Sequence, residues 1–179
     1  VKSTNKEFLK DASIVIWTTT PWTIPANRAL AFNSNIEYSL LEIDDLEFFK
    51  EKKIIVAKNL IEEIIKECEI KNYKEIKTFK GSEFVGTICS HPFLKMNYNY
   101  DVPMLDGQFV NLDQGTGIVH CAPSHGPDDF NLCLKNNIPS LYTVDNAGLY
   151  TKEIPHFTGT HIFKADPVVI ENLKEQNKL

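Results

Sequence analysis

The sequence has few cysteines, no long apolar run and no excess of positive charge, and each lack argues against a class of protein. Its 179 residues include four cysteines, none of them in a Cys-x-x-Cys pair, so we expect no zinc knuckle. No segment approaches the roughly 18–20 uninterrupted apolar residues of a membrane-spanning helix, and we expect no membrane partner. A net charge of −5 argues against wrapping a long stretch of nucleic-acid backbone, but it is compatible with contact to a few nucleotides.

Familiar catalytic motifs are also missing. Ser124 has no Gly-x-Ser-x-Gly elbow around it, and Cys121 flanks an apolar run as a small core residue would. Gly115-Thr116-Gly117 lacks the length and the lysine of a phosphate-binding loop, so it predicts a tight turn before a strand. Scattered thiols without a secretory signal favour a cytoplasmic protein.

Apolar periodicity predicts a mostly β protein with a few helices. The expected strands are residues 12–17, Arg28 to Phe32, Glu37 to Ile43, Lys53 to Lys58, the neighbourhood of Phe79, Phe84 to Ile88, Val102 to Leu105, Phe109 to Leu112 and Ile118 to Ala122. The expected helices are residues 59–68 with Asn59 as N-cap, Pro127 to Asn136, and Asp166 to Gln176. This pattern favours an α+β fold, mostly β: an irregular β-barrel decorated by helices, forming one domain over residues 1–179. The mixed Lys and Glu of residues 50–80 predict a solvated helix face and strand edge rather than an RNA-binding patch.

The most distinctive segment runs from Trp17 to Asn27. It holds four threonines, two tryptophans and two prolines directly after an expected buried strand. Strand side chains alternate, so the hydroxyls of Thr18, Thr19 and Thr20 cannot all face one way. We therefore expect at least one of them to line a cavity for a small polar ligand, with both indoles as wall and core.

A second segment, Gly115 to Phe130, carries charge. Asp128 and Asp129 fall in the first turn of an expected helix, where complementing the helix dipole is worth about 0.3–1 kcal/mol. One acid is enough for that, so the other is a candidate anchor for a cationic ligand. His120, His125 and Asp129 must also be considered as metal ligands, but their spacing matches no metal-binding motif and we expect no metal.

These two segments together resemble the signature segments of the editing domain of isoleucyl-tRNA synthetases. Related valine and leucine enzymes typically carry Arg at the position of Thr20, so Thr20 and the Gly126-Pro127-Asp128-Asp129 ending favour the isoleucine type. The resemblance covers nearly the whole chain and implies the editing-domain fold of these synthetases. The chain lacks the His-Ile-Gly-His-type and Lys-Met-Ser-Lys-Ser segments of the adenylate-forming domain, so we expect a fragment of a longer synthetase, with no cofactor and no synthetic activity.

The resemblance implies hydrolysis of the aminoacyl ester of mischarged Val-tRNA(Ile), with Ile-tRNA(Ile) excluded by size. It implies that Asp129 binds the α-ammonium group and that His120 sets the size of the side-chain space. It also implies threonines that hold the terminal adenosine, the ester and the attacking water, namely Thr18, Thr19, Thr20 and Thr23, with Asn27 at the pocket edge. The implied partners are the 3′ end of tRNA(Ile) and the rest of the parent chain, with Arg28, Lys152 and Lys164 as candidate basic contacts.

Three other functions are compatible with the same residues. A binding module would recognise an ammonium-bearing ligand without hydrolysing it. A metal-dependent hydrolase would use His120, His125 and Asp129. A free-standing editing protein would act without a parent synthetase.

Overall fold

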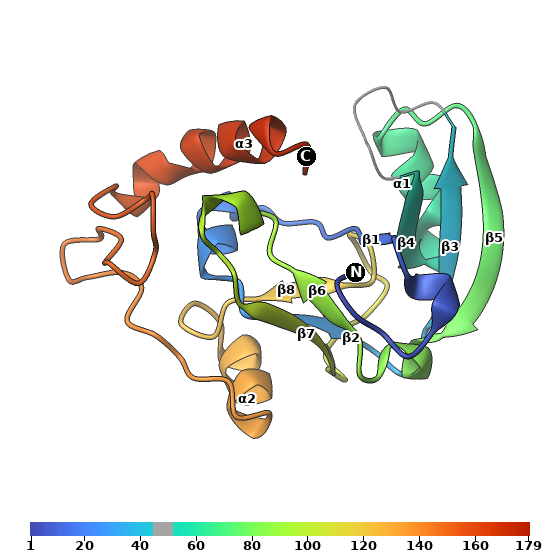
Figure 1. Cartoon of the computed structure of the whole chain (residues 1–179), viewed down its shortest axis with the longest axis horizontal. Helices are drawn as coiled ribbons and strands as arrows, with labels where there is room; N and C mark the ends of the chain where they lie inside the picture. Colours follow the sequence, from blue (N-terminus) through green and yellow to red (C-terminus); the bar gives the residue numbers. More distant parts are fainter. Residues whose placement is uncertain (45–51) are drawn as a thin grey trace. The chain divides into compact units, whose positions relative to one another are not determined.

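The structure, a computed structural model, describes residues 1–44 and 52–179 (Figure 1). Its strands are β1 (Ser13–Ile14), β2 (Ala29–Phe32), β3 (Glu37–Ile43), β4 (Lys53–Ala57), β5 (Tyr73–Lys80), β6 (Ile88–Ser90), β7 (Asp101–Asp106) and β8 (Val119–Cys121). Its α-helices are α1 (Ile61–Glu67), α2 (Pro127–Lys135) and α3 (Ala165–Glu175). Short 3₁₀ helices fill several connections, and the one at Pro21–Ala26 positions the candidate site. None of the helices in these ranges is long and apolar enough to cross a membrane.

The strands form two four-stranded sheets, with the orders β1-β4-β3-β5 and β6-β7-β2-β8. In the first sheet β3 is antiparallel to both β4 and β5, and β1 is parallel to β4. In the second sheet β2 is parallel to β7, with Leu30 opposite Met104. The expected α+β, mostly β class is confirmed, but among the described residues the strands lie in two open sheets and close no barrel.

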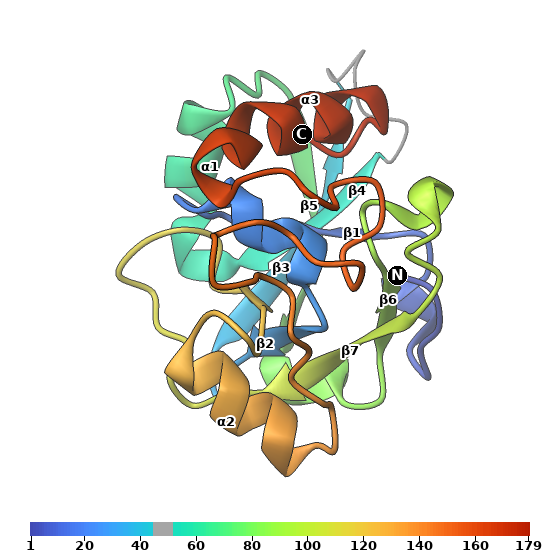
Figure 2. The same cartoon turned by 90° about the vertical axis from the view of Figure 1, so that its left-hand side faces the viewer.

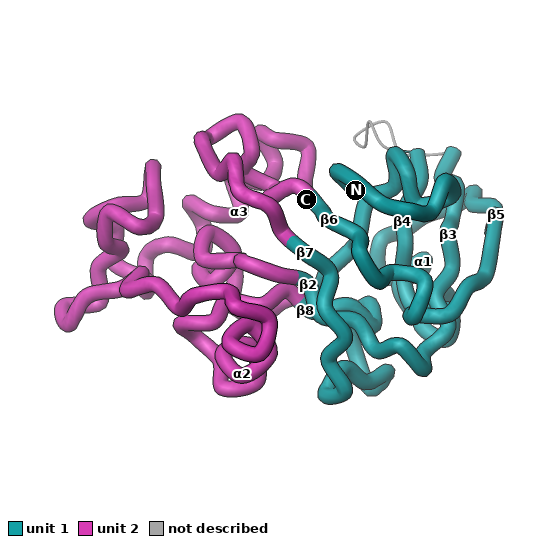
Figure 3. Tube along the Cα trace, turned by 60° about the horizontal axis from the view of Figure 1, so that its bottom comes forward, with its two compact units in different colours: residues 1–17, 30–89, 103–119 teal, residues 18–29, 90–102, 120–179 magenta. Residues whose placement is uncertain are grey.

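The chain divides into two units, which Figure 3 colours separately. Unit 1 consists of Val1–Trp17, Leu30–Cys89 and Pro103–Val119, and unit 2 consists of Thr18–Ala29, Ser90–Val102 and His120–Leu179. All the residues predicted to form the site, from Thr18 to Asp129, belong to unit 2.

The core of unit 1 is built around aromatic rings and one buried hydroxyl. Phe84 lies edge-on to Tyr38 and Phe79, at centroid distances of 5.0 and 5.2 Å. The Tyr38 hydroxyl donates a hydrogen bond to the Gly117 carbonyl oxygen at 2.8 Å. Gly117 has a φ of +73°, and a Cβ there would lie 2.4 Å from the Ala57 Cβ, so only glycine fits. This confirms the tight turn expected at Gly115-Thr116-Gly117.

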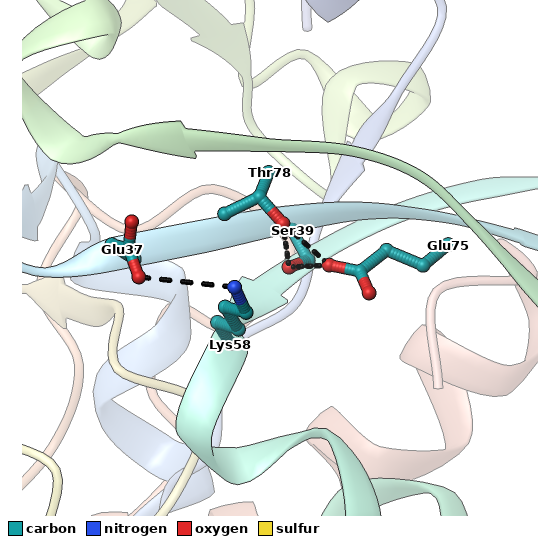
Figure 4. A network of polar contacts seen from close by, with 5 residues as sticks. All are labelled: Glu37, Ser39, Lys58, Glu75 and Thr78. Carbon is teal, nitrogen blue, oxygen red and sulfur yellow. Dashed lines mark hydrogen bonds and ion pairs between the residues drawn. The ribbon is translucent and has the colours of Figure 1, made fainter.

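The edge strand β5 is polar and mostly exposed, and a small hydrogen-bond network ties it to β3 (Figure 4). The hydroxyls of Ser39 and Thr78 each donate to Glu75 Oε1 at 2.6 Å. These two hydrogen bonds lower the pKa of the Glu75 carboxyl because they favour its charged form. A solvated strand edge is therefore confirmed for this part of residues 50–80, of which 50 and 51 lie outside the described residues.

Unit 2 has its own core, which holds the 3₁₀ helix Pro21–Ala26 in place. Helix α3 places Ala165, Val169 and Leu173 on one face, at the four-residue spacing that keeps side chains on the same side of a helix. This face packs with Ile24 and Ala26 of the 3₁₀ helix, drawn in blue below α3 in Figure 2. In addition, Asp166 Oδ1 accepts a hydrogen bond from the Trp22 backbone N–H at 2.8 Å.

Several elements were predicted correctly. The strand Glu37–Ile43 agrees at both ends, and the two later helices agree within one residue at each end. The strands expected near residues 28–32, 53–58, 102–105 and 118–122 are present as β2, β4, β7 and β8.

Other predictions were wrong. The run 12–17 forms only the two-residue strand β1, and Trp17 is 49% exposed rather than wall or core. Asn59 is not an N-cap, because a 3₁₀ turn precedes α1 and its cap residue, Leu60, makes no side-chain cap. Phe84 ends the 3₁₀ turn Gly81–Phe84, and of the strand expected from Phe84 to Ile88 only Ile88 belongs to a strand, β6. Phe109 to Leu112 forms none. Most of β5 was missed because only Phe79 of its eight residues is buried.

Candidate functional site

The threonine segment is an irregular turn and not a strand end. The backbone N–H of Thr20 donates to Thr18 Oγ1 at 3.0 Å, a side-chain turn that replaces strand pairing. The alternation expected for Thr18 to Thr20 was therefore wrong. Thr19 is exposed and Thr20 half-buried, and within the described residues neither hydroxyl has a hydrogen-bond partner. Both hydroxyls are available to a ligand.

Prolines explain the local shape after this turn. Pro21 opens the 3₁₀ helix Pro21–Ala26, and Pro25 inside it removes a backbone donor, so the segment cannot continue as an α-helix. The N–H of Thr23 donates to the Thr20 carbonyl oxygen at 3.0 Å, and the N–H of Asn27 donates to that of Ile24 at 3.0 Å. The helix therefore fixes Thr23 three residues after Thr20.

Thr23 holds the ring of His120. The Thr23 hydroxyl donates to the Thr20 carbonyl oxygen at 2.9 Å. The hydroxyl oxygen of Thr23, Oγ1, also lies 3.1 Å from His120 Nε2. A hydroxyl has one proton, so both contacts are satisfied only when Nε2 of His120 carries the hydrogen and donates it. His120 Nδ1 is then an acceptor. This atom is buried and has no partner among the described residues, although the residue as a whole keeps some exposed surface.

The electrostatic surroundings keep this ring neutral. Burial, with a smaller contribution from the nearby His125, lowers the pKa of His120 to about 4. At neutral pH the ring is therefore an uncharged hydrogen-bonding side chain. That state is suited to lining a pocket next to a cationic group, which a charged imidazolium would repel.

The carboxylate of Asp129 is bound to the residue that follows β8. Asp129 lies in the first turn of α2, and its Oδ2 accepts a hydrogen bond from the Ala122 N–H at 2.8 Å. Gly126 leaves room for the carboxylate, because a Cβ at that position would lie 3.2 Å from the Asp129 Cγ. Burial raises the pKa of Asp129, and the Ala122 hydrogen bond opposes this shift. A carboxylate has about four acceptor positions, so this bond leaves capacity for a ligand.

Asn27 lies at the turn between the 3₁₀ helix and β2. It is 5% exposed, and its Oδ1 accepts from the Ala29 N–H at 3.2 Å, which starts β2. Its carbonyl oxygen accepts from the Tyr100 hydroxyl at 2.9 Å. These two hydrogen bonds fix the turn, and the place of Asn27 at the edge of the pocket stays a prediction.

Two further histidines support the same segment. His125 lies edge-on to the Trp22 ring at a centroid distance of 4.7 Å, and its Nε2 is 2.9 Å from Thr143 Oγ1. His91, which the sequence did not single out, is buried and places Nε2 3.0 Å from the Ile24 carbonyl oxygen. Burial lowers the pKa of His91 to about 3. No sequence signal pointed to His91, since its partner lies 67 residues away.

The structure thus brings some predicted residues together and leaves others apart. A chain of contacts joins Thr20, Thr23 and His120, and Asp129 is tied to Ala122, two residues beyond His120. Within the described residues no hydrogen bond joins the hydroxyls of residues 18–20 to His120 or Asp129. In the same part of the chain no three His, Cys, Asp or Glu side chains are arranged to hold a metal ion. The candidate basic residues Lys152 and Lys164 are exposed.

Comparison with solved structures defines the class of protein. The fold is similar to the editing domain of the cytosolic leucyl-tRNA synthetase of P. knowlesi, with a TM-score of 0.71 and 14% identity over 97% of this chain and 85% of that one. The corresponding P. falciparum domain gives a TM-score of 0.69 at 15% identity, over 97% of this chain and 81% of that one. At this identity the likeness establishes the fold alone, which is that of a synthetase editing domain.

The sequence then gives the family. Residues 9–172 match the family described as "Leucyl-tRNA synthetase, editing domain", and the chain belongs to that family. It is 63% identical over its whole length to an isoleucine–tRNA ligase of Pelagibacter ubique, and 45% identical over 89% of its length to that of Gluconobacter oxydans. The chain spans only about a fifth of the length of these relatives, 20% and 17%. The predicted resemblance to the isoleucyl editing domain is confirmed.

Proposed function

We propose that this chain hydrolyses the aminoacyl ester of Val-tRNA(Ile) and spares Ile-tRNA(Ile), whose larger side chain does not fit. The need for such a step is physical. One methylene in an apolar pocket changes the binding free energy by only about 1–3 kcal/mol. The standard example of this limit is the discrimination between isoleucine and valine by an isoleucyl-tRNA synthetase. A second pocket that admits only the smaller side chain corrects the errors of the first. Two observations support this substrate: the relatives are isoleucine–tRNA ligases, and residue 20 is Thr rather than the Arg typical of the valine and leucine enzymes.

The observation that carries the proposal is the state of Asp129. Its half-buried carboxylate has no cationic partner among the described residues, yet the Ala122 N–H holds it in one orientation. Such a group suits the α-ammonium of an aminoacyl ester, because a charge-assisted hydrogen bond both neutralises the carboxylate and fixes the substrate. Asp128, its exposed neighbour, has only the helix N-terminus to complement.

Catalysis in this proposal comes mainly from positioning. The free hydroxyls of Thr19 and Thr20, with the side-chain turn at Thr18, bind the terminal adenosine, the ester and the attacking water, and Thr23 contributes through His120. The water oxygen attacks the ester carbonyl carbon, the bond from that carbon to the ribose oxygen breaks, and the ribose oxygen takes up a proton. The substrate's neighbouring ribose hydroxyl assists the water, so the protein supplies orientation and electrostatic stabilisation.

The partners follow from the same substrate. We propose that the 3′ end of tRNA(Ile) enters the site and that residues 1–179 work as one editing domain attached to the rest of a synthetase, in the cytoplasm where tRNA is charged. The short chain length relative to the isoleucine ligases supports this arrangement.

A matched pair of substitutions tests the proposal. Asp129→Asn removes the charge that binds the ammonium, and we expect deacylation of Val-tRNA(Ile) to slow by roughly ten- to a hundredfold, the range for a hydrogen bond to a charged group. Asp128→Asn makes the same change, from carboxylate to amide, at the neighbouring residue. Its rate of deacylation should match that of the unchanged chain. Release of labelled valine from the tRNA measures both. Equal rates for the two variants would remove Asp129 from the site.

The same assay separates the competing functions. If the chain binds the tRNA 3′ end but valine is released no faster than in buffer, the chain is a binding module. If release stops after treatment with a chelator, the metal-dependent hydrolase is the correct reading.

A further inference from the structure

A pocket in unit 2 has a cationic wall that the proposed hydrolysis does not use. Its lining includes Pro25 and Ala26 at the end of the 3₁₀ helix, together with Arg28, Tyr100 and Glu153. None of the residues proposed to contact the ester lines it. The pocket and the ester site are nevertheless linked, because Thr23 belongs to the same 3₁₀ helix as Pro25 and Ala26.

Arg28 is the only arginine in a chain that otherwise carries its positive charge on eighteen lysines. Its guanidinium carbon lies 4.3 Å from the centroid of the Tyr100 ring, whose hydroxyl is fixed by its hydrogen bond to the Asn27 carbonyl oxygen. The Arg28 backbone N–H donates to the Cys121 carbonyl oxygen at 2.8 Å, so both ends of the residue are anchored. Ring and backbone therefore hold the guanidinium in one place.

One guanidinium donor of Arg28 lacks an acceptor within the described part of the chain. Arg28 Nε is buried and has no hydrogen-bond partner among the described residues, and no carboxylate there forms an ion pair with Arg28. Buried donors and charges are normally paired, because an unpaired one loses its hydration without compensation. Arg28 lines the pocket, is half-buried and has no carboxylate partner there, so an anion in the pocket would pair with its guanidinium charge.

The other lining groups select the kind of anion. Arg28 is the only basic residue of the lining and Glu153 the only acidic one, and the Ser124 hydroxyl is occupied because it donates to the Leu141 carbonyl oxygen at 2.5 Å. The guanidinium fork is thus the main source of attraction, and its planar pairs of donors match the oxygens of a phosphate group.

We propose that Arg28 and this pocket bind a phosphate oxyanion, which in the cell is a phosphodiester of the single strand that carries the aminoacyl ester. That this phosphate belongs to the strand bearing the aminoacyl ester rests on the proposed function, whereas the binding of a phosphate group by Arg28 does not. A strand anchored here through its backbone delivers its terminal nucleoside to the other end of the same 3₁₀ helix, where the threonines lie.

The side-chain Nε–H signal of Arg28 gives a direct test, since a chain with one arginine has one such NMR signal. We expect it to shift on titration with inorganic phosphate at millimolar concentration, and at lower concentration with a short single-stranded oligonucleotide ending in adenosine. A signal that responds to neither probe would overturn the proposal. A response to inorganic phosphate with none to the oligonucleotide would overturn the phosphodiester carrier and leave an adventitious ion only.

Variants with opposite expected effects complete the test. Arg28→Gln should weaken oligonucleotide binding roughly tenfold and reduce the slope of log affinity against log salt by about 0.7, the value for one phosphate contact to a single strand. Glu153→Gln should strengthen phosphate binding by up to about fivefold, because a like charge leaves the pocket. Lys174→Gln changes an exposed lysine of unit 2 that does not line the pocket; it is the control and should change binding less than either.

Two results would contradict the proposal even if Arg28→Gln fails to fold. One is a Glu153→Gln chain whose Arg28 signal loses its dispersion without phosphate, since Glu153 would then be the acceptor. The other is unchanged phosphate affinity in that variant. Asp129→Asn should leave the Arg28 response intact, so a failure of the hydrolytic proposal and a failure of this one are distinguishable.

Discussion

At His120 a single contact with Thr23 decides which ring nitrogen carries the proton. Because the Thr23 hydroxyl gives its own proton to the Thr20 carbonyl oxygen, the ring must donate through Nε2, which leaves Nδ1 as a buried acceptor. A ring fixed in this way has a defined position as well as a defined charge. A wall of fixed position can discriminate between side chains that differ by one methylene, whereas a mobile wall yields to the larger one.

Shortening this side chain should therefore relax the discrimination. In His120→Ala we expect hydrolysis of Ile-tRNA(Ile) to rise roughly tenfold or more, because the space left by the ring accepts the additional methylene. The measurement is the ratio of deacylation rates for Ile-tRNA(Ile) and Val-tRNA(Ile). Val119→Ala shortens an exposed neighbour on β8 and serves as the control. An unchanged ratio in His120→Ala would show that another residue sets the size limit.

Single residues differ in how far their roles could be predicted from sequence. Two adjacent acids exceed what a helix N-terminus needs, which made one of the pair a candidate, and the family resemblance pointed to Asp129. Asp129 is half-buried and Asp128 is exposed. The burial of Asn27 and His91 could not be predicted, because their partners Tyr100 and Ile24 lie 73 and 67 residues away. Pairings at such separations leave no local pattern in the sequence.

At the scale of elements, the 3₁₀ helix Pro21–Ala26 positions Thr23 of the candidate site, and α3 packs against this 3₁₀ helix. The Trp22 N–H donates to Asp166, and the Trp22 carbonyl oxygen accepts from the Tyr150 hydroxyl. Both backbone polar groups of Trp22 are thus satisfied from elements that follow more than 120 residues later. The orientation of the threonine turn depends on this late part of the chain.

Removing the Asp166 carboxylate should loosen this support. We expect Asp166→Ala to lower the free energy of unfolding by about 1–3 kcal/mol, because it leaves the Trp22 N–H without its acceptor. Asp166→Asn keeps an oxygen at the same position and should cost clearly less. Urea denaturation of both variants measures the difference. A loss of equal size in Asp166→Asn would assign the effect to charge at the N-terminus of α3 rather than to the hydrogen bond.

Elements were predictable where local pattern and packing agree. Helices α2 and α3 show both a regular apolar spacing and a proline in the first turn, and β3 is bounded by clear turn residues. The threonine segment failed because β propensity competed with Pro21 and Pro25, and the fixed backbone of proline decided the outcome. The prediction missed most of strand β5 because β5 is an edge strand with mostly exposed residues, so its sequence shows no apolar alternation.

At the scale of the whole molecule, buried neutral histidines link stability to pH. His91 and His120 have pKa values lowered to about 3 and about 4, and burial also lowers the pKa of His125. In the unfolded chain each returns to a pKa near 6.5. Below about pH 6.5 the unfolded chain therefore binds protons that the folded chain refuses, and the equilibrium shifts toward unfolding.

The free energy of unfolding should accordingly be constant above about pH 6.5 and fall as the pH drops from there toward 4. Each buried histidine contributes up to about 1.4 kcal/mol per pH unit in this window. Asp129 acts in the opposite direction, since its raised pKa lets the folded chain take up a proton first, but it is set against the strongly lowered pKa values of His91 and His120. The check is the urea midpoint measured between pH 7 and pH 5.

A substitution identifies the source of the slope. His91→Phe cannot be protonated, so we expect it to destabilise the chain at neutral pH through its lost hydrogen bonds but to flatten the dependence on pH. His156→Asn changes an exposed histidine, keeps a residue that tolerates its φ of +64°, and should leave the slope as it is. A full slope in His91→Phe would mean that groups other than His91 produce it. A midpoint that stays level from pH 7 to pH 5 would mean that the folded chain takes up histidine protons as readily as the unfolded chain does. With a level midpoint, His120 would carry a charge in part of the molecules just below neutral pH. An imidazolium there would repel the ammonium group that Asp129 is proposed to bind, so hydrolysis of Val-tRNA(Ile) should then fall as the pH drops below about 6.5.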